Sequence, residues 1–351
     1  MYYELKPSIR ILYNKEKKIV RMGGTEPLAC EFEIEDDKFL DVLTYFDGNH
    51  SVEDIGNILK IEQKLINEIV RYLLDNQLLE KKTQEVDLFY DRFNNYLKIS
   101  PPFLDKNSVE ILEILNRKKV AIIGCGAIGC NVLRQLVAGG IKEFVLYDDD
   151  KIEVSNIGRQ ILYDMDDIGK LKVEVCKEKI SKLNKNVNFK VVNEKINKFN
   201  FGNILDCDLL VLSADTPANI GELINKICID NNIPFIKAGM YESYALLGPL
   251  VQPFKTACFE CLLSKSKTFI DKEEIYSQIN KYPYLWKQGL HPSLIMLSAS
   301  IVSSEIIKIL TLGKSKFLNH TAIVDMNNLN FYWSEFQKNE QCLVCGVNHD
   351  L

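Results

Sequence analysis

The stretch from residue 119 to residue 160 constrains the fold most, because it combines a buried strand, a glycine turn, a helix and a second strand. Apolar residues 120–123 predict the first strand, residues 131–138 the helix and residues 144–147 the second strand. The turn carries Gly124, Gly126 and Gly129. Glycines at this spacing let the backbone turn tightly and approach a phosphate, and the start of the helix offers free N–H groups to the anion. This βαβ half-unit therefore predicts a nucleotide site.

Charged residues after the second strand indicate which nucleotide is bound. Asp148 lies nineteen residues after Gly129, where such folds place a carboxylate that binds ribose. A dehydrogenase needs no cationic cluster beyond this point, yet Arg159 and Lys172 follow, and Asp215 comes soon after an apolar strand predicted over 209–212. An arginine and a lysine suit a triphosphate, and an aspartate at the carboxyl end of a strand suits its Mg²⁺. The pattern favours ATP over a dinucleotide.

Together these motifs resemble those of the ThiF-type, ubiquitin-activating-like adenylating superfamily, over roughly residues 89–345. The resemblance implies that Asp148 holds the ribose and that Asp150 also belongs to the nucleotide site. It further implies that the N-x-x-R-Q run and a downstream lysine hold phosphates, and that a later aspartate serves Mg²⁺. The residues matched to the phosphates and the metal are Asn156, Arg159, Lys172 and Asp215. The last three of these are the implied catalytic residues.

A segment ahead of the glycine strand, residues 87–96, is similar to the piece of this family in which an arginine reaches the nucleotide phosphates of the neighbouring protomer. Arg92 is the matching catalytic candidate, and the resemblance implies a homodimer. Without the resemblance, a lone arginine in a linker is a surface charge. Pro101 and Pro102 break any helix that continues from here. We therefore expect residues 84–118 to form a linker with a dimer-contacting segment.

Strands and helices alternate in the α/β domain, which we place at residues 119–351. Helical spacing over 173–183 is followed by strands over 189–192 and 209–212 and by a helix over 218–231. This alternation predicts a doubly wound, Rossmann-like, mostly parallel sheet. Ligands of such sheets lie beyond the carboxyl ends of the strands, where we expect Arg159 and Lys172.

Residues 1–83 predict a separate α+β module with a winged-helix-like pattern. A hairpin joins strands at residues 9–13 and 19–22, a turn is expected over 47–49, and three short helices include one capped by Ser51. Winged helices often bind DNA. However, this module has 12 Lys and Arg residues and 16 Asp and Glu residues. Its net charge is therefore negative, whereas binding to nucleic-acid phosphates requires a basic surface. We therefore expect no nucleic-acid partner.

The N-terminal module is instead similar to the small leader-peptide recognition domains fused to enzymes that modify ribosomally made peptides. Such domains take up an extended peptide by strand addition to an exposed sheet edge. The hairpin over residues 9–22 offers such an edge, and the acidic balance of the module suits a peptide with basic or apolar side chains. A dimerisation or packing module is the alternative interpretation.

Four of the ten cysteines form two C-x2-C pairs, Cys258 with Cys261 and Cys342 with Cys345, and 80 residues separate the pairs. Each pair points two sulfurs at one centre, and two pairs complete a tetrahedral four-cysteine site. We expect a structural zinc ion that clamps the C-terminal region onto the α/β domain. The other six cysteines are expected to be small buried side chains.

The excursion between the cysteine pairs begins with a polar, aromatic-rich segment, residues 262–290, which the resemblance identifies as a crossover above the active site. In enzymes of the family that pass an activated acyl group to sulfur, this segment carries a cysteine. The chain has no cysteine between Cys261 and Cys342. We therefore expect no acyl-thioester intermediate on the crossover.

Composition fits a soluble globular protein of 351 residues with a net charge of -5 and 46% hydrophobic residues. The N-terminus lacks a basic segment followed by an apolar one, and we expect no apolar run near the ~20 residues that a membrane-spanning helix needs. The sequence therefore predicts a cytoplasmic protein without a membrane segment.

The reaction implied is attack of a carboxylate oxygen on the α-phosphate of ATP, with Mg²⁺ and Zn²⁺ as the other cofactors. The layout resembles that of the microcin-C-type enzymes, which adenylate the C-terminal carboxylate of a short ribosomally made peptide on the way to a peptide natural product. A precursor peptide is therefore the expected partner. Two alternatives stay open: activation of a ubiquitin-like sulfur carrier for thiamin or molybdopterin synthesis, and a non-catalytic adaptor that presents peptides to another enzyme.

Overall fold

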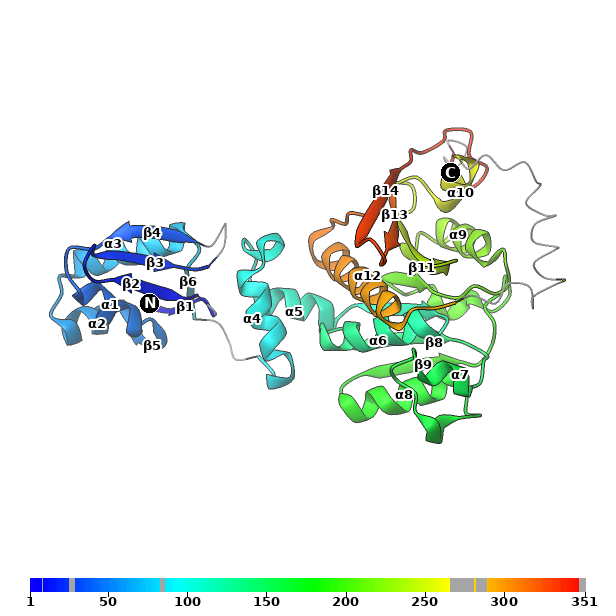
Figure 1. The fold of residues 1–351 in the computed structure, drawn as a ribbon, viewed down its shortest axis with the longest axis horizontal. Coiled ribbons are helices and arrows are strands. Elements are labelled where there is room, and N and C mark those ends of the chain that lie inside the picture. Colours follow the sequence, from blue (N-terminus) through cyan, green and yellow to red (C-terminus); the bar gives the residue numbers. More distant parts are fainter. Residues whose placement is uncertain (8, 25–28, 83–85, 266–280, 282–288, 347–351) are drawn as a thin grey trace. The chain divides into compact units, whose positions relative to one another are not determined.

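The computed structural model describes the chain apart from residues 8, 25–28, 83–85, 266–280, 282–288 and 347–351. The chain separates into two compact units, Met1–Glu113 and Ile114–Leu351, both drawn in Figure 1. Each unit has its own cluster of buried apolar side chains, so each is described by itself.

The first unit contains two three-stranded antiparallel sheets, in the orders β5-β1-β6 and β2-β3-β4. Its elements are β1 (Tyr2–Leu5), β2 (Ile11–Asn14), β3 (Ile19–Met22), β4 (Cys30–Glu33), α1 (Lys38–Thr44), β5 (Asp47–Ser51), α2 (Val52–Leu59), α3 (Gln63–Asp75), β6 (Leu79–Lys81), η1 (Leu88–Tyr90), α4 (Asp91–Ile99), η2 (Pro101–Phe103) and α5 (Ser108–Asn116). The predicted hairpin is present as β2 and β3, and α5 spans the boundary between the units.

Local sequence signals account for part of this unit. The Ser51 side chain accepts a hydrogen bond from the Asp54 N–H, and the Asp54 carboxylate accepts one from the Ser51 N–H, so α2 starts where its cap predicts. The turn predicted over 47–49 is wrong, because these residues form strand β5. Glu4 of β1 lies opposite Asp47 in the sheet, and such a distant partner overrides the local preference of Asp, Gly and Asn for turns.

Helix α4 is fastened to the strands of the first unit by a buried ion pair network. The Lys98 Nζ lies 2.9 Å from Glu4 on β1 and 2.5 Å from Glu80 on β6, and the lysine side chain is 8% exposed. Removing one member of such a network leaves a buried charge without its partner, which is strongly destabilising. Helix α4 is therefore part of the first unit, with Lys98 on its buried face.

An eight-stranded sheet, in the order β14-β13-β12-β11-β10-β7-β8-β9, organises the second unit. Its elements are β7 (Lys119–Ile123), α6 (Ala127–Ala138), β8 (Glu143–Tyr147), α7 (Val154–Ile157), η3 (Met165–Asp167), α8 (Lys172–Leu183), β9 (Asn188–Val192), η4 (Phe201–Ile204), β10 (Leu209–Leu212), α9 (Ile220–Asp230), β11 (Phe235–Tyr241), β12 (Tyr244–Val251), α10 (Phe259–Lys265), α12 (Pro292–Leu312), β13 (His320–Asp325) and β14 (Asn330–Glu335).

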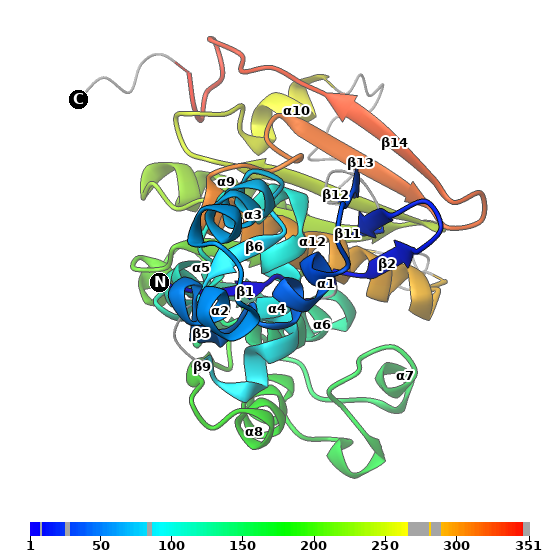
Figure 2. The ribbon, with the colours of Figure 1, turned by 90° about the vertical axis from the view of Figure 1, so that its left-hand side faces the viewer.

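Strands β7 to β11 pair in parallel, whereas β12, β13 and β14 extend the sheet antiparallel; Figure 2 shows the last three side by side. Helices α6 and α12 pack against each other. On the α9 side of the sheet, Ile220 and Ile224 pack with alternate strand residues such as Ala121 and Ile123. The predicted α/β fold with a mostly parallel sheet is confirmed.

Helix α12 corrects the expectation that no apolar run approaches the length of a membrane span. It has 21 residues and a mean hydropathy of 1.7 in its most apolar window, which meets the length and composition of a span. More than half of that window, 56%, is buried inside the structure. Glu305 within the helix accepts hydrogen bonds from Ser315 and from the Lys316 N–H, both at 2.7 Å. This is the pattern of a core helix.

Candidate functional site

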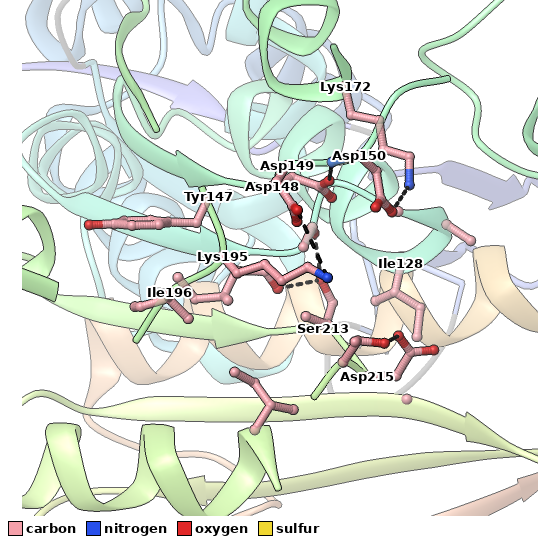
Figure 3. A pocket seen from close by; sticks show the side chains of 18 of the residues that line it. Ile128, Tyr147, Asp148, Asp149, Asp150, Lys172, Lys195, Ile196, Ser213 and Asp215 are labelled. Carbon is pink, nitrogen blue, oxygen red and sulfur yellow. Dashed lines mark hydrogen bonds and ion pairs between the residues drawn. The ribbon is translucent and has the colours of Figure 1, made fainter. Parts of the chain in front are cut away.

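A crevice of about 660 Å³ lies beyond the carboxyl ends of β7, β8 and β10 (Figure 3). Strands β10 and β7 are neighbours, and the chain runs from them in opposite directions, to β11 on one side and to β8 on the other. The crevice therefore sits at a topological switch point, where open α/β sheets bind ligands. Its lining includes Gly124, Gly126, Asp148, Asp150, Asn156, Arg159, Lys172 and Asp215. The structure thus brings together most of the residues that the sequence proposed.

At two positions of the glycine turn the neighbouring backbone is too close for any side chain. Gly124 has a φ of +93°, and a Cβ there would lie 2.8 Å from the Ala214 backbone nitrogen. A Cβ on Gly129 would lie 1.9 Å from the Gly124 carbonyl oxygen, so Gly129 packs behind the turn and is not among the lining residues. Gly126 has open space around it and stands at the N-cap of α6. The turn therefore leaves room for an anion at the N-terminus of this helix.

Asp148 is held in place by two backbone donors. Its carboxylate accepts hydrogen bonds from the Cys125 N–H at 2.6 Å and from the Asp150 N–H at 2.8 Å. Burial raises the pKa of Asp148, while nearby Lys172 acts in the opposite direction. The carboxylate is thus fixed directly beside the glycine turn, at the end of β8, where a ribose hydroxyl would find an acceptor.

Lys172, the first residue of α8, is the buried cation of the crevice. Its Nζ lies 2.7 Å from the Asp150 carboxylate, and its side chain is 8% exposed. A dashed line in Figure 3 marks this ion pair. Burial alone would lower the pKa of Lys172, but the carboxylates of Asp148 and Asp150 outweigh burial and raise it. The lysine is therefore charged at neutral pH, and Asp150 orients it.

Arg159 and Asn156 lie around the short helix α7. The Asn156 side-chain oxygen accepts a hydrogen bond from the Glu153 N–H at 3.1 Å, which closes a capping box. The Arg159 guanidinium donates to the Ser155 carbonyl oxygen, whereas its Nε is buried and has no hydrogen-bond partner in the described part of the chain. A buried donor without an acceptor is costly. The arrangement fits an anionic ligand that would accept from this nitrogen.

Asp215 is exposed in the crevice, three residues after β10 ends. The Thr216 hydroxyl donates to its carboxylate at 3.3 Å, and Ser213 ties this loop to the glycine turn by donating to the Gly124 carbonyl at 2.8 Å. Mg²⁺ on a nucleotide takes one or two protein carboxylates and completes its shell with phosphate oxygens and water. A single exposed carboxylate at this position fits that requirement.

The four paired cysteines converge, as predicted. Their sulfurs all lie within 4.8 Å of one another, with Cys258 and Cys342 at 3.7 Å and Cys261 and Cys345 at 3.5 Å. Sulfurs around a tetrahedral zinc ion with bonds of about 2.3 Å lie roughly 3.8 Å apart. The Asn225 amide donates toward the Cys258 sulfur at 3.6 Å, and the Asn339 N–H donates to Cys261 at 3.4 Å. Spacing and donors both fit a structural zinc ion.

Two sequence predictions fall outside this site. Arg92 is exposed on α4 in the first unit, so its role at the nucleotide stays a prediction. Most of the crossover expected over 262–290 lies outside the described residues. Leu290, its last residue, is described and lines the crevice.

Several crevice residues were missed by the sequence interpretation. Lys195 and Ile196 follow β9, and the Lys195 Nζ lies 3.9 Å from Asp149. Lys237 on β11 and Phe259 at the start of α10 line the opposite end. None of them belongs to a motif. For Lys237 a signal existed, because a lysine inside the apolar run from Pro234 to Ala238 is unusual for a buried strand.

Solved structures of one enzyme, MccB, are similar to almost the whole chain. The microcin C7 biosynthetic enzyme MccB, in complex with N-formylated MccA, superposes with a TM-score of 0.78 at 26% identity, covering 99% of this chain and 100% of that one. MccB from E. coli with ATP gives a TM-score of 0.77 at the same identity and coverage.

Two curated relatives are named as an adenylyltransferase and as a subunit of an activating enzyme. The chain is 26% identical to the sulfur carrier protein adenylyltransferase of Thermus thermophilus over 67% of its own length and 84% of the relative. It is 31% identical to SUMO-activating enzyme subunit 2 of Dictyostelium discoideum over 41% of its own length, but spans only 22% of that relative. The profile of the ThiF family matches residues 101–345, which is more than half of the chain. The protein belongs to the ThiF family of ATP-dependent adenylating enzymes.

Proposed function

We propose that this enzyme transfers AMP from ATP to the C-terminal carboxylate of a ribosomally made peptide, during synthesis of a peptide natural product in the cytoplasm. The extent of the likeness to MccB carries the proposal. The ThiF profile begins at residue 101, whereas MccB covers 99% of the chain and therefore also its first unit. MccB has been solved both with ATP and with MccA, which supports a peptide as the second substrate here.

In the proposed reaction one carboxylate oxygen bonds to the α-phosphorus of ATP, and the bond from that phosphorus to the β-phosphate oxygen breaks. The products are an acyl adenylate and pyrophosphate. A carboxylate is already ionised at neutral pH, so the site needs fixed positive charge more than a general base. Arg159 and Lys172 would supply that charge to the phosphates, and Asn156 would hold the loop that presents Arg159.

The other crevice residues would fix the nucleotide. Asp148 would accept from the ribose hydroxyls, and Gly124 and Gly126 leave the N-terminus of α6 open to a phosphate. Asp215 would hold Mg²⁺, which neutralises charge on the phosphates when it is bound. The zinc ion, held by the four cysteines, would have a structural role, because four thiolates leave no open position for water or substrate.

The first unit offers a place for the peptide. A groove of about 600 Å³ runs between β4, α1 and α3. Among the described residues β4 pairs only with β3, so its outer edge is free to accept an extended strand. Phe32 of β4 lies on the groove with its ring 5.1 Å from Phe39 and 5.0 Å from Tyr72. These rings would give apolar side chains of the peptide a place to pack.

Charge in the groove indicates the kind of peptide. The groove is lined by five carboxylates and one lysine: Glu33, Glu35, Asp36, Glu62, Glu68 and Lys38. A peptide with basic side chains near apolar anchors would complement this surface. Binding at the groove would raise the effective concentration of the peptide's carboxylate at the crevice, on the order of millimolar for a short flexible tether.

Activation of a sulfur carrier protein is the second candidate. The likeness to the Thermus enzyme favours it, since the two chains share 26% identity over 84% of that relative. A non-catalytic adaptor is the third, and the complete set of crevice residues disfavours it. Exchange of labelled pyrophosphate into ATP separates all three, because it requires reversible formation of an acyl adenylate.

We expect exchange only when a short peptide with a free C-terminal carboxylate is present, with peptides encoded beside the gene as the first to test. The same peptide with an amidated C-terminus should give none. Exchange with a small carrier protein ending in Gly-Gly, and not with peptides, would establish the second candidate instead. Exchange with neither would contradict an adenylating role for this chain.

Reversing two groove charges tests the recognition role. With Glu33→Lys and Glu68→Lys together, we expect the peptide KM to rise about tenfold at low salt while kcat is unchanged, because exposed charge pairs contribute ~0.2–1 kcal/mol each. The rise should shrink in high salt. Pyrophosphate exchange against peptide concentration, at two ionic strengths, measures both effects.

Glu16→Lys is the matched control for the groove, because Glu16 is exposed in the β2–β3 turn and does not line the groove. A KM shift that equals that of Glu16→Lys, or one that salt leaves unchanged, would remove the groove from substrate recognition. The first unit would then be a packing or dimerisation module.

Arg92 is proposed to act across a homodimer. Arg92→Ala alone should lower exchange about a hundredfold, as the loss of one transition-state contact does. Co-expression with the Asp215→Ala chain should restore about a quarter of the wild-type rate. A working site then needs one chain that keeps Asp215 and a partner chain that keeps Arg92. If the two kinds of chain pair at random, about one site in four meets both conditions. No recovery would place Arg92 on its own chain's nucleotide, and a fully active Arg92→Ala protein would make it a surface charge.

A further inference from the structure

The crevice continues past Asp215 to an end that carries none of the sequence motifs. This far end is formed by β11, the start of α9 and the start of α10, and its lining includes Gly221, Lys237, Gly239 and Phe259. In the sheet Lys237 lies opposite Leu212, the last residue of β10. The far end is therefore next to the proposed Mg²⁺ ligand, and the glycine turn separates it from Asp148, the proposed ribose carboxylate just after β8.

Close packing shapes this end around one side chain. A Cβ on Gly221 would lie 2.6 Å from the ring of Phe259, so the ring packs directly on α9. The Lys237 Nζ lies 5.6 Å from the centre of that ring. A Cβ on Gly239 would lie 3.9 Å from the same Nζ. Lys237 is thus held against an aromatic face, and the glycine two residues later leaves space open beside its ammonium group.

Among the described residues, no anionic group contacts the ammonium group of Lys237. Within the residues that the structure describes, no hydrogen bond or ion pair joins its Nζ to another group, in contrast to Lys172, which lies 2.7 Å from Asp150. Burial lowers the pKa of Lys237, while the carboxylates of Glu222 and Asp215 act from farther away in the opposite direction. A half-buried ammonium group that lacks a close anion gains most from a ligand that brings one.

We infer that Lys237 binds the reacting carboxylate of the acyl substrate and that the far end of the crevice holds the substrate's last residue. The inference rests on the proposed adenylation and assigns a site for its second substrate. The carboxylate must approach an anionic α-phosphate, and the two anions repel each other. An ammonium group on the acyl side offsets that repulsion and orients the attacking oxygen, while the ring of Phe259 keeps the lysine in position.

The test compares ligands that do and do not reach the far end. ATP and AMP occupy only the nucleotide side, whereas 5′-O-(N-acetylsulfamoyl)adenosine, a stable mimic of the smallest acyl adenylate, adds an acyl carbonyl. For Lys237→Met we expect the affinity for the mimic to fall ~10–100-fold, as for a lost hydrogen bond to a charged group. The affinities for ATP and AMP should change less than about twofold. Calorimetric titration of the full-length protein measures all three.

Two further variants sharpen the comparison. Lys237→Arg keeps the charge and should recover part of the affinity for the mimic. Lys226→Met is the matched control, because Lys226 lies on the exposed side of α9, paired with Asp230; it should bind all three ligands like the wild type. Should Lys237→Met fail to fold, as judged by its melting temperature, Lys237→Gln carries the same expectation.

The outcomes separate this inference from the proposed function. A wild-type protein that binds ATP but not the mimic contradicts adenylation and this inference with it. A wild-type protein that binds the mimic, together with a Lys237→Met variant that binds it equally well, overturns the role of Lys237 alone. Equal losses of affinity for ATP and for the mimic would assign Lys237 to the triphosphate and likewise overturn the inference.

Discussion

Alanine at Asp215 or at Arg159 will slow carboxylate-dependent pyrophosphate exchange at least about a hundredfold, because removing one contact to developing charge typically costs ~3 kcal/mol. The two residues act on the same phosphates from different sides of the crevice. Arg159 presents a buried Nε without a described partner, and Asp215 an exposed carboxylate at the end of β10. Initial rates of exchange at saturating ATP and substrate measure the loss.

Milder substitutions distinguish the two roles. Asp215→Asn keeps the shape but loses the charge, so its rate should recover partly at raised Mg²⁺ concentration, whereas that of Arg159→Ala should not. Arg159→Lys keeps the charge but loses the planar fork that suits a phosphate, and should remain impaired. The controls are Asp230→Ala on α9 and Arg21→Ala on β3, both in exposed ion pairs. Wild-type exchange in both alanine variants would refute the assigned roles.

Removal of the metal from the four-cysteine site will have the largest effect on stability. We expect one zinc ion per chain in the wild type and its loss in Cys345→Ser. The melting temperature should then fall on the order of 10 °C, since a structural zinc site contributes several kcal/mol and 1 kcal/mol shifts melting by about 2–4 °C in a unit of this size. Elemental analysis and thermal unfolding, with and without a chelator, measure the two effects.

Cys30→Ser is the matched control for the zinc site, because Cys30 belongs to the first unit and is not one of the four clustered cysteines. ATP binding at low temperature should survive in Cys345→Ser, since none of the four cysteines lines the crevice. A metal-free wild type that melts as high as the zinc-loaded protein would show that the cluster does not stabilise this fold. A complete loss of ATP binding in a folded variant would give the metal a role at the site.

The sequence predicted best those elements that are buried on both faces. Strand β10 has the bounds expected, because Leu209–Leu212 is a short apolar run flanked by polar residues. Strand β14 escaped prediction because its residues, Asn330–Glu335, are all exposed and show no alternation. Strands β1 and β5 escaped because each depends on the other, across some forty residues of chain.

The residues of the site also fall into a group that the sequence predicts and a group that it does not. Residues that follow the glycine turn in a fixed order, such as Asp148, Arg159 and Lys172, carry a pattern that a sequence reveals. Lys195 reaches the crevice because β9 ends at that edge of the sheet, and Lys237 because β11 pairs there with the end of β10. Their positions depend on how strands from distant parts of the chain are ordered, which no local pattern contains.

The buried position of Lys98 determines where this protein can be divided and recombined. Its partners, Glu4 and Glu80, sit on the first and last strands of the N-terminal module, while the lysine itself lies beyond the predicted end of that module at residue 83. A fragment ending at 83 would leave two carboxylates together without their counter-ion. A graft intended to give another adenylating enzyme a new peptide preference should therefore carry residues 1–113 as one piece, and natural exchange of such modules between enzymes would face the same boundary.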